Sequence, residues 1–202
     1  MHHYIRDHIC QPLGMTSTSF ALDEAQRARL TRVHLRQADG SLTVMDWPVG
    51  AEPGYCMGGG GICSTARDYL TFLRALLAGG ALPEGNKRIL RPETVAAMGQ
   101  NSMGALDVLP MRSGDPVRSN DCEMFPGMVK KWGLGFLINT EAAPNGGRSA
   151  GSLAWAGLGN TYFWLDPARR VAGIILMQIL PFADPEALGL LDRFERAIYA
   201  SL

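Results

Sequence analysis

The spacing of apolar side chains predicts one strong helix in the middle of the chain. Between positions 65 and 77 the apolar residues recur at intervals of three and four, which places them on one face of a helix. Thr65 and Asp68 form a variant capping box, because Thr65 can accept from the Asp68 amide while the Asp68 carboxylate reaches back. Gly79-Gly80 allows a left-handed stop. The expected buried face consists of Tyr69, Phe72, Leu73, Leu76 and Leu77.

The sequence before this helix predicts one more helix and a hairpin. Residues 2–11 have the pattern of the tail of a helix that stops at Pro12, because proline has no N–H to continue the hydrogen-bond ladder, and a turn is expected at Gly14. Residues 32–35 and 41–44 are two short extended runs joined by a turn at Asp39-Gly40. This pattern is typical of a surface hairpin.

Beyond the central helix the pattern is first irregular and then extended. A short helix is expected from Pro92 to Met98, and residues 101–131 lack periodicity and predict a long loop. Three extended runs with short turns then predict an antiparallel meander. The runs are 134–140, 152–165 and 171–180, with turns at Asn145-Gly146-Gly147 and Asp166-Pro167.

The chain ends in an amphipathic helix. Asp184 suits its N-cap and Pro185 its first position. Its apolar face, which needs the sheet for burial, contains Leu188, Leu191, Phe194 and Ile198. The whole pattern predicts an α+β protein over residues 1–202. We expect an antiparallel β-sheet meander with a C-terminal helix packed on it and a partly helical N-terminal region.

Composition narrows the classes of function. The 202 residues are 47% hydrophobic, enough for one globular domain or a large part of a bigger one. The 19 Lys and Arg residues balance 19 Asp and Glu residues without long single-sign runs, so no nucleic acid partner is expected. The longest mostly apolar stretch, residues 171–180, is about half of what a membrane helix needs, so no membrane partner is expected. The N-terminal residues lack the features of a secretory signal, which leaves the compartment open.

No metal, nucleotide or other cofactor site is predicted. The chain contains neither a G-x-x-x-x-G-K-[ST] phosphate loop nor a C-x-x-C pair at metal-ligand spacing. The cysteines are therefore expected to be free and buried, and the histidines to be solvated. These residues are Cys10, Cys56, Cys63, Cys122, His2, His3, His8 and His34.

Ser149 lies in a G-x-S-x-G pattern, the sequence of a nucleophile elbow. An elbow needs a helix after the serine and a histidine further along the chain. Here an extended run follows and no histidine lies downstream. The glycines are better explained by a hairpin turn.

Segment 151–167 is the most informative for chemistry. If one strand runs through it, Trp155, Gly157 and Gly159 lie on one face. Glycines inside a strand often mark the close approach of a ligand or of another backbone. Close packing against a helix explains them equally well, so the residues alone leave both interpretations open.

Four segments, in their order along the chain, resemble the serine β-lactamase-related hydrolases. This superfamily contains class C β-lactamases, penicillin-binding proteins and family VIII esterases. The resemblance extends from near Ile5 to the end of the chain and implies an incomplete β-lactamase-like fold with acyl-enzyme serine chemistry. The matching segments are 11–15, 58–69, 155–157 and 159–167.

The resemblance also implies roles for single residues. The superfamily places a K-T-G strand opposite its serine, and esterase-like members carry W-x-G there, which matches Trp155 and Gly157. Ala156 would then lie along the acyl group. The backbone N–H of Leu158 would be one of two oxyanion-hole donors, each typically worth about 3 to 4 kcal/mol. Tryptophan in place of lysine removes a cation for a substrate carboxylate, so neutral esters are expected rather than penicillin-like acids.

The glycine run before the central helix matches a segment that lines the acyl-side pocket in the superfamily. By this match Gly59 and Gly60 contact substrate, and Gly60 leaves room for a bulky acyl group. The alternative is an ordinary glycine-rich helix start without a binding role.

The chain departs from the superfamily in its nucleophile. No serine lies three residues before a lysine, and no asparagine lies two residues after a tyrosine, so S-x-x-K and Y-x-N are both absent. We expect the C-terminal portion of a serine hydrolase that acts on a small ester or amide and cannot form an acyl-enzyme alone. Its expected partners are the missing N-terminal half or a second copy. The alternative is a noncatalytic scaffold or partner-binding protein with the same fold, which binds through an unpaired sheet edge.

Overall fold

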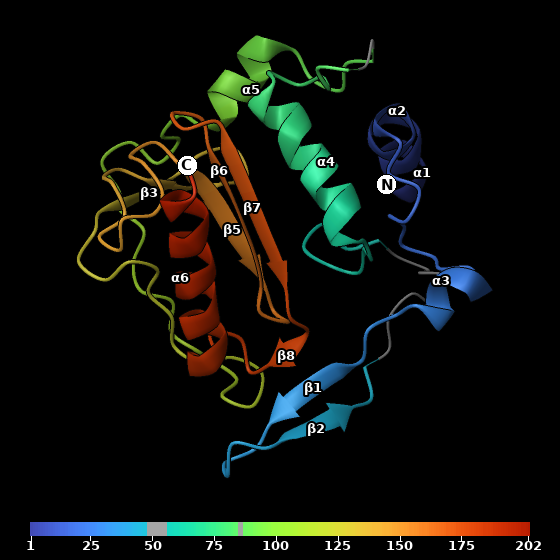
Figure 1. Cartoon of the computed structure of the whole chain (residues 1–202), viewed down its shortest axis with the longest axis vertical. Coiled ribbons are helices and arrows are strands. Elements are labelled where there is room, and N and C mark those ends of the chain that lie inside the picture. Colours follow the sequence, from blue (N-terminus) through green and yellow to red (C-terminus); the bar gives the residue numbers. More distant parts are fainter. Residues whose placement is uncertain (48–55, 85–86) are drawn as a thin grey trace.

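The computed structural model describes residues 1–47, 56–84 and 87–202. The larger of its two sheets is antiparallel and has five strands in the order β3-β4-β5-β6-β7 (Figure 1). Each of these strands pairs with the next along the chain. The α+β class and the antiparallel meander are thereby confirmed. The strands are β3 (Lys130–Trp132), β4 (Leu137–Asn139), β5 (Leu153–Gly157), β6 (Thr161–Asp166) and β7 (Val171–Leu176).

The prediction of one strand over residues 152–165 was wrong. The chain turns after Gly157, and β6 runs back beside β5 with Phe163 opposite Trp155. Gly159 therefore lies in the turn and not on a strand face with Trp155. Asn160 closes the turn in the left-handed region, with φ of 53°, a conformation that asparagine tolerates better than most residues.

Two other strand boundaries also differ from the prediction. β3 begins at Lys130, inside the predicted loop, because Lys130 pairs with Asn139 of β4. The run 171–180 is interrupted at Gln178, whose φ of 56° ends the extended conformation. β8 (Ile179–Leu180) follows and belongs to a different sheet.

Helices cover both faces of the large sheet (Figure 1). α6 (Pro185–Ala200) packs on one face, and α4 (Ala66–Leu77) with α5 (Pro92–Met98) packs on the other. All three helices are confirmed, and so are the expected apolar faces of α4 and α6. On the α6 side the buried residues are Ala154, Tyr162, Trp164, Leu191 and Tyr199. On the α4 side they are Leu73, Leu76, Phe136, Ile138, Leu153 and Leu165.

The helix starts follow the predicted capping in part. Asp184 accepts from the Ala187 amide at 3.0 Å, and Thr65 accepts from the Asp68 amide at 3.2 Å. The Asp68 carboxylate does not reach back to complete a capping box. Instead, it is buried and accepts from the backbone N–H of Ser17 at 2.8 Å, so it holds the N-terminal segment against α4.

The predicted hairpin is confirmed and forms a second, smaller sheet. β1 (Val33–Arg36) and β2 (Leu42–Met45) pair antiparallel, and β1 also pairs parallel with β8. Arg36 forms an ion pair with the buried Asp184 at the start of α6. The hairpin is therefore bound to the segment that leads into α6 (Figure 1).

The N-terminal region is partly helical, as expected, but its helix does not stop at Pro12. It continues to Leu13, and the predicted turn at Gly14 is confirmed by its φ of 69°. The helix ends in a Schellman motif, in which the Met15 N–H donates to the Cys10 carbonyl oxygen at 2.9 Å and the Gly14 N–H donates to the Gln11 carbonyl oxygen at 3.2 Å. The elements are α1 (His2–Ile5), η1 (Arg6–Cys10), α2 (Gln11–Leu13) and α3 (Glu24–Ala28).

Candidate active site

The Trp155-Ala156-Gly157 motif forms the second half of β5, the central strand of the large sheet. The Trp155 side chain is half-buried and packs edge-on against Trp132 of β3. Their ring centroids lie 4.5 Å apart with the planes at 87°, an arrangement that aromatic pairs favour. The motif is therefore held in a fixed position by side-chain packing as well as by strand pairing.

One edge of this motif has no strand partner. β5 pairs with β4 only through Leu153 and Ala154, whereas all five of its residues pair with β6. The edge of residues 155–157 that faces away from β6 is thus unpaired within the described ranges. Such an edge presents backbone N–H and C=O groups that can pair with an extended ligand.

Leu158 continues this edge into the turn. Its side chain is 43% exposed, and its N–H donates no hydrogen bond to any part of the chain that the structure describes. An unpaired N–H at a partly exposed position is available to a developing negative charge on a bound carbonyl oxygen. The assignment of this N–H to an oxyanion hole remains a prediction.

Gly157 has a reason within the protein for lacking a side chain. A Cβ at this position would lie 2.3 Å from Oγ1 of Thr161, its partner on β6. The group that closely approaches Gly157 is therefore the Thr161 hydroxyl group on the neighbouring strand. The expected contact of Gly157 with substrate remains a prediction.

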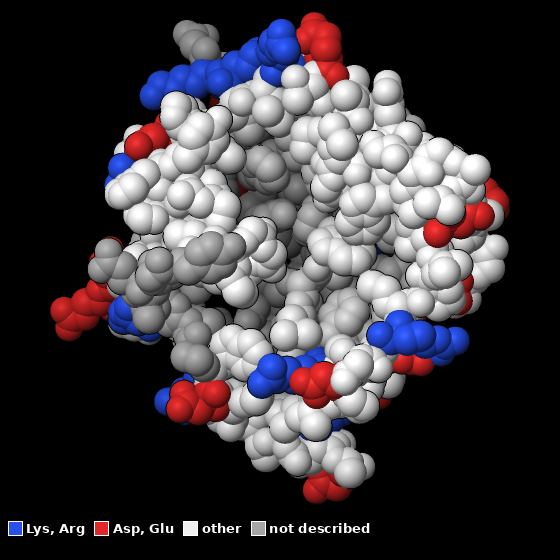
Figure 2. All heavy atoms as spheres, turned by 180° about the vertical axis from the view of Figure 1, so that it is seen from behind, with Lys and Arg blue, Asp and Glu red and all other residues white. Residues whose placement is uncertain are grey.

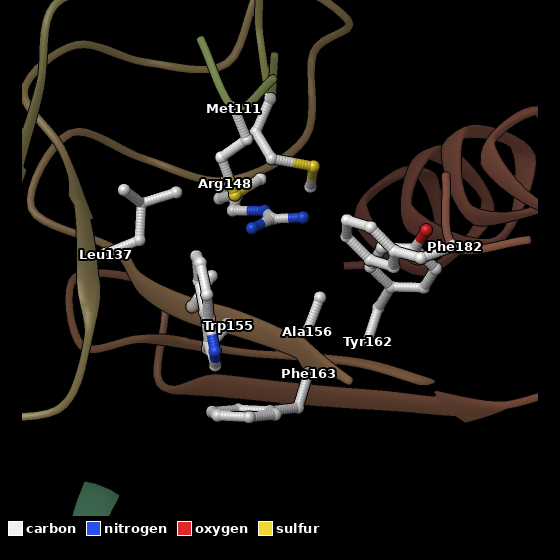
Figure 3. A pocket seen from close by; sticks show the side chains of 10 residues that line it. Met111, Leu137, Arg148, Trp155, Ala156, Tyr162, Phe163 and Phe182 are labelled. Carbon is white, nitrogen blue, oxygen red and sulfur yellow. The ribbon is translucent and has the colours of Figure 1, made fainter. Parts of the chain in front are cut away.

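The space beside Trp155 and Ala156 is part of the core (Figure 3). In this view the Arg148 guanidinium lies between Met111 and Ala156. The cavity measures about 10 Å³, the lower limit for a single water molecule. It is too small for an acyl group, so any substrate contact of Ala156 must come from the strand edge.

Arg148 is neutralised inside the protein. Its Nη2 lies 2.6 Å from Oε2 of Glu195 on α6, and both side chains are buried. Its guanidinium also lies 5.1 Å from the ring centroids of Phe125 and Trp164. The pair is therefore structural, and Arg148 is not available to a substrate anion.

The structure does not bring Gly59 and Gly60 to the motif. Gly59 is exposed, and a Cβ there would meet no atom within 4 Å. A Cβ at Gly60 would meet only the Met57 side chain, at 3.7 Å. Neither glycine borders the space beside Trp155. Their predicted contact with substrate remains untested.

An apolar groove lies at the other end of β5. It has a volume of about 370 Å³ between α4, α5 and the sheet, and Leu153 and Phe136 are among the residues that line it. Leu153 is five residues from Leu158, which is roughly 16 Å along an extended strand. None of residues 155–158 lines this groove.

One face of the molecule is largely uncharged. Figure 2 shows Lys, Arg, Asp and Glu mainly around its rim, with a hollow near its centre.

The described residues contain no cluster of three His, Cys, Asp or Glu side chains that could hold a metal ion. No helix in the same ranges is long and apolar enough to cross a membrane. The four cysteines are free, as predicted, but only Cys10 and Cys122 are buried.

Ser149 lies in a turn. Its backbone N–H donates to Oδ2 of Asp166 at 2.8 Å, and its carbonyl accepts from the Ser152 N–H at 3.2 Å. Gly151 follows with φ of 80°. The geometry is that of a hairpin connection before β5, which agrees with the turn interpretation of this motif.

The sequence analysis did not single out Asn160, which is fully buried although it lies only two residues after the exposed Leu158. A signal was present, because a Gly-Asn pair between two apolar runs is typical of a hairpin turn. Its side-chain partners, Ile179, Pro181 and Tyr162, include residues about 20 positions away. Local sequence patterns do not predict such contacts.

The chain has the α+β architecture of an antiparallel sheet with helices on both faces, and its W-x-G motif lies on the central strand of that sheet. A sequence model of the beta-lactamase family matches residues 1–196, and the chain belongs to this family. The resemblance to the serine β-lactamase-related superfamily, whose members include hydrolases and acyltransferases, is thereby confirmed.

Several relatives of this chain are named as acyltransferases. The chain is 30% identical over 215 residues to monacolin J acid methylbutanoyltransferase of Aspergillus terreus, covering 98% of this chain and 48% of the relative. A mutant simvastatin synthase (LovD) of the same species superposes with a TM-score of 0.83 at 28% identity, covering 99% of this chain and 50% of the other. EstCE1, described as a hydrolase with promiscuous acyltransferase activity, shares the fold at 18% identity, with a TM-score of 0.66 over 98% of this chain and 49% of its own. The chain thus spans about half the length of these relatives.

Proposed function

We propose that this chain is the C-terminal portion of a serine acyltransferase or hydrolase and provides one wall of its acyl site. The observation that carries the proposal is the unpaired edge of residues 155–157, which continues into the free N–H of Leu158. The serine nucleophile, its lysine and the tyrosine belong to a segment outside this sequence, because S-x-x-K and Y-x-N are absent from it.

In this proposal the chain stabilises the negative charge that develops on the carbonyl oxygen of the acyl group. A serine oxygen supplied from outside the chain bonds to the carbonyl carbon, and the serine proton passes through a base to the departing alcohol or amine. While the carbonyl oxygen carries negative charge, the Leu158 N–H donates to it. Water or an alcohol then bonds to the acyl carbon, the ester bond to the serine oxygen breaks, and the proton of the water or alcohol passes through the base to the serine oxygen. Water gives hydrolysis and an alcohol gives acyl transfer.

The expected substrate is a neutral ester with an apolar acyl group. Trp155 stands where lysine would supply a cation, and Arg148 is already paired with Glu195. One relative is named a methylbutanoyltransferase, which supports a small branched acyl group.

The proposal is tested by replacing the Leu158 amide with an ester. The substitution is made in a polypeptide that joins this chain to the segment carrying S-x-x-K and Y-x-N. It exchanges N–H for oxygen and keeps the leucine side chain. We expect kcat to fall by about 10²- to 10³-fold with a small change in KM. Leu158→Ala keeps the N–H and measures the side chain separately. An unchanged kcat in the ester variant would exclude the oxyanion role.

A second candidate function is a noncatalytic protein that binds a partner by strand addition. β7 forms an edge of the large sheet, and Leu176 at its end is 41% exposed. An unpaired edge strand favours pairing with another chain. A self-associating chain that stays inert towards esters after it is joined to the missing motifs would favour this function.

A further inference from the structure

The turn that carries Leu158 has a defined conformation. Three residues, Leu158 to Asn160, connect the paired residues Gly157 and Thr161. Three-residue hairpin turns commonly end in one left-handed residue, and Asn160 has φ of 53°. The orientation of the Leu158 amide therefore depends on how Asn160 is held.

The Asn160 side chain is fully buried and uses both of its polar atoms. Nδ2 donates to the carbonyl oxygens of Ile179 and Pro181 at 2.8 and 2.7 Å. Oδ1 accepts from the hydroxyl group of Tyr162 at 2.6 Å. Because carbonyl oxygens only accept, the amide nitrogen must face them. Burial raises the pKa of Tyr162, which keeps its hydroxyl group protonated as a donor.

The segment that receives these bonds is itself held from several sides. Ile179 and Leu180 pair with β1, and the Phe182 carbonyl accepts from the Asn120 N–H at 2.9 Å. The Ile179 N–H donates back to the Gly159 carbonyl at 3.1 Å. A Cβ on Gly159 would lie 3.4 Å from the Gln178 Cα, so the turn lies directly against this segment.

We infer that Asn160 is a positioning residue that holds the Leu158 N–H in its direction by binding the turn to the segment 179–181. The inference rests on the proposed function and adds the residue that preorganises its oxyanion donor. A donor that is fixed before the reaction does not have to reorient when charge develops, which is the source of its effect on rate. Loss of Asn160 should therefore lower kcat more than it raises KM.

The test compares Asn160→Gly with Asn145→Gly. Glycine keeps the left-handed backbone at position 160 and removes all three side-chain hydrogen bonds. Asn145 is a matched control, because its side chain also binds a turn to another element, at 2.9 Å from Asp192 on α6. It lies in the connection before β5, whereas Asn160 lies after it.

Two readouts separate the possible failures. The ¹⁵N order parameter of the Leu158 amide is measured in the 202-residue chain. It should fall from about 0.85 to below about 0.6 in Asn160→Gly and stay unchanged in Asn145→Gly. In the joined polypeptide, kcat for an ester should fall by about 10-fold or more only in Asn160→Gly. Tyr162→Phe, which removes one bond, should change both readouts in the same direction by less.

The outcomes are distinct. A rigid Leu158 amide in Asn160→Gly, or an effect of the same size in Asn145→Gly, would overturn the positioning role. If Asn160→Gly does not fold, the same decision is made on Tyr162→Phe. Failure of the proposed function is recognised separately, as an unchanged kcat after the Leu158 amide is replaced by an ester.

Discussion

Arg148 binds Glu195 through its backbone and its side chain at once. The Arg148 N–H donates to Oε1 of Glu195 at 3.1 Å, and Nη2 donates to Oε2 at 2.6 Å. The two residues join the connection before β5 to α6, and both are almost completely buried. The position of β5 relative to α6 therefore depends on this pair.

Removing one partner of this pair should destabilise the protein strongly. Glu195→Gln keeps the shape of the side chain but leaves the Arg148 charge buried without a counter-charge, which typically costs about 3 to 5 kcal/mol. The double variant Arg148→Met with Glu195→Leu leaves no buried charge and should be more stable than Glu195→Gln. Urea unfolding measures both. A double variant less stable than the single one would contradict this account.

Asp166 should make the stability of the protein sensitive to acid. Burial acts to raise the pKa of this carboxyl group, but the hydrogen bonds from Ser149, Arg169 and Tyr199 outweigh burial and hold the pKa below its ordinary value. A depressed pKa in the folded state stabilises the protein above the unfolded pKa of about 3.9, and this stabilisation is lost as the pH falls through the folded value.

The variant Asp166→Asn tests this dependence. It should lower the free energy of unfolding at neutral pH and flatten its decline below about pH 4, because no charge remains to be titrated there. Urea unfolding at a series of pH values measures the slope. The exposed Asp46→Asn variant controls for the change in net charge. Parallel pH profiles for Asp166→Asn and the unaltered chain would contradict the expectation.

The parts of the fold that were predicted correctly depend on local sequence. The N-cap Asp184 and the apolar spacing after it lie within one helix, and the same holds for Thr65 and α4. The errors involve contacts between distant residues. The Asp68 carboxylate bonds to Ser17 instead of its own helix, a partner 51 positions away.

In the candidate site, too, the features set by local sequence were predicted and those set by contacts between distant residues were not. Alternation placed Trp155 and Gly157 in an extended segment, and both lie on β5, although this strand ends at Gly157 and does not run on to residue 165. The unpaired edge beside them arises because β4 is only three residues long, a feature that depends on sheet register. The role of Asn160 depends on Ile179 and Pro181, which no local pattern connects to the turn.

Two glycines offer a matched test of packing. A Cβ on Gly173 of β7 would lie 2.2 Å from Cζ2 of Trp164, whose buried ring has no room to move. Gly173→Ala should therefore destabilise the protein by up to about 3 kcal/mol. Gly189 lies within α6, where a Cβ would meet only the mobile end of Arg193 at 3.4 Å. Gly189→Ala should stabilise the protein by about 0.5 to 1 kcal/mol. Thermal unfolding that shifts both variants in the same direction would contradict this account.

The 202-residue chain alone should not form an acyl-enzyme. The hydroxyl groups of Ser64 and Thr18 lie 2.8 Å apart, and Thr18 donates to Asp68 at 2.9 Å, but no lysine or histidine in the described ranges is bonded to this group as a base. Incubation with a p-nitrophenyl ester, followed by intact-mass measurement, should show no acyl addition and no burst of p-nitrophenol. The polypeptide joined to the S-x-x-K and Y-x-N segment is the positive control and should acylate on the serine of that segment. A labelled serine within residues 1–202, located by peptide mapping, would show that this chain carries its own nucleophile and would end the proposal of a divided site.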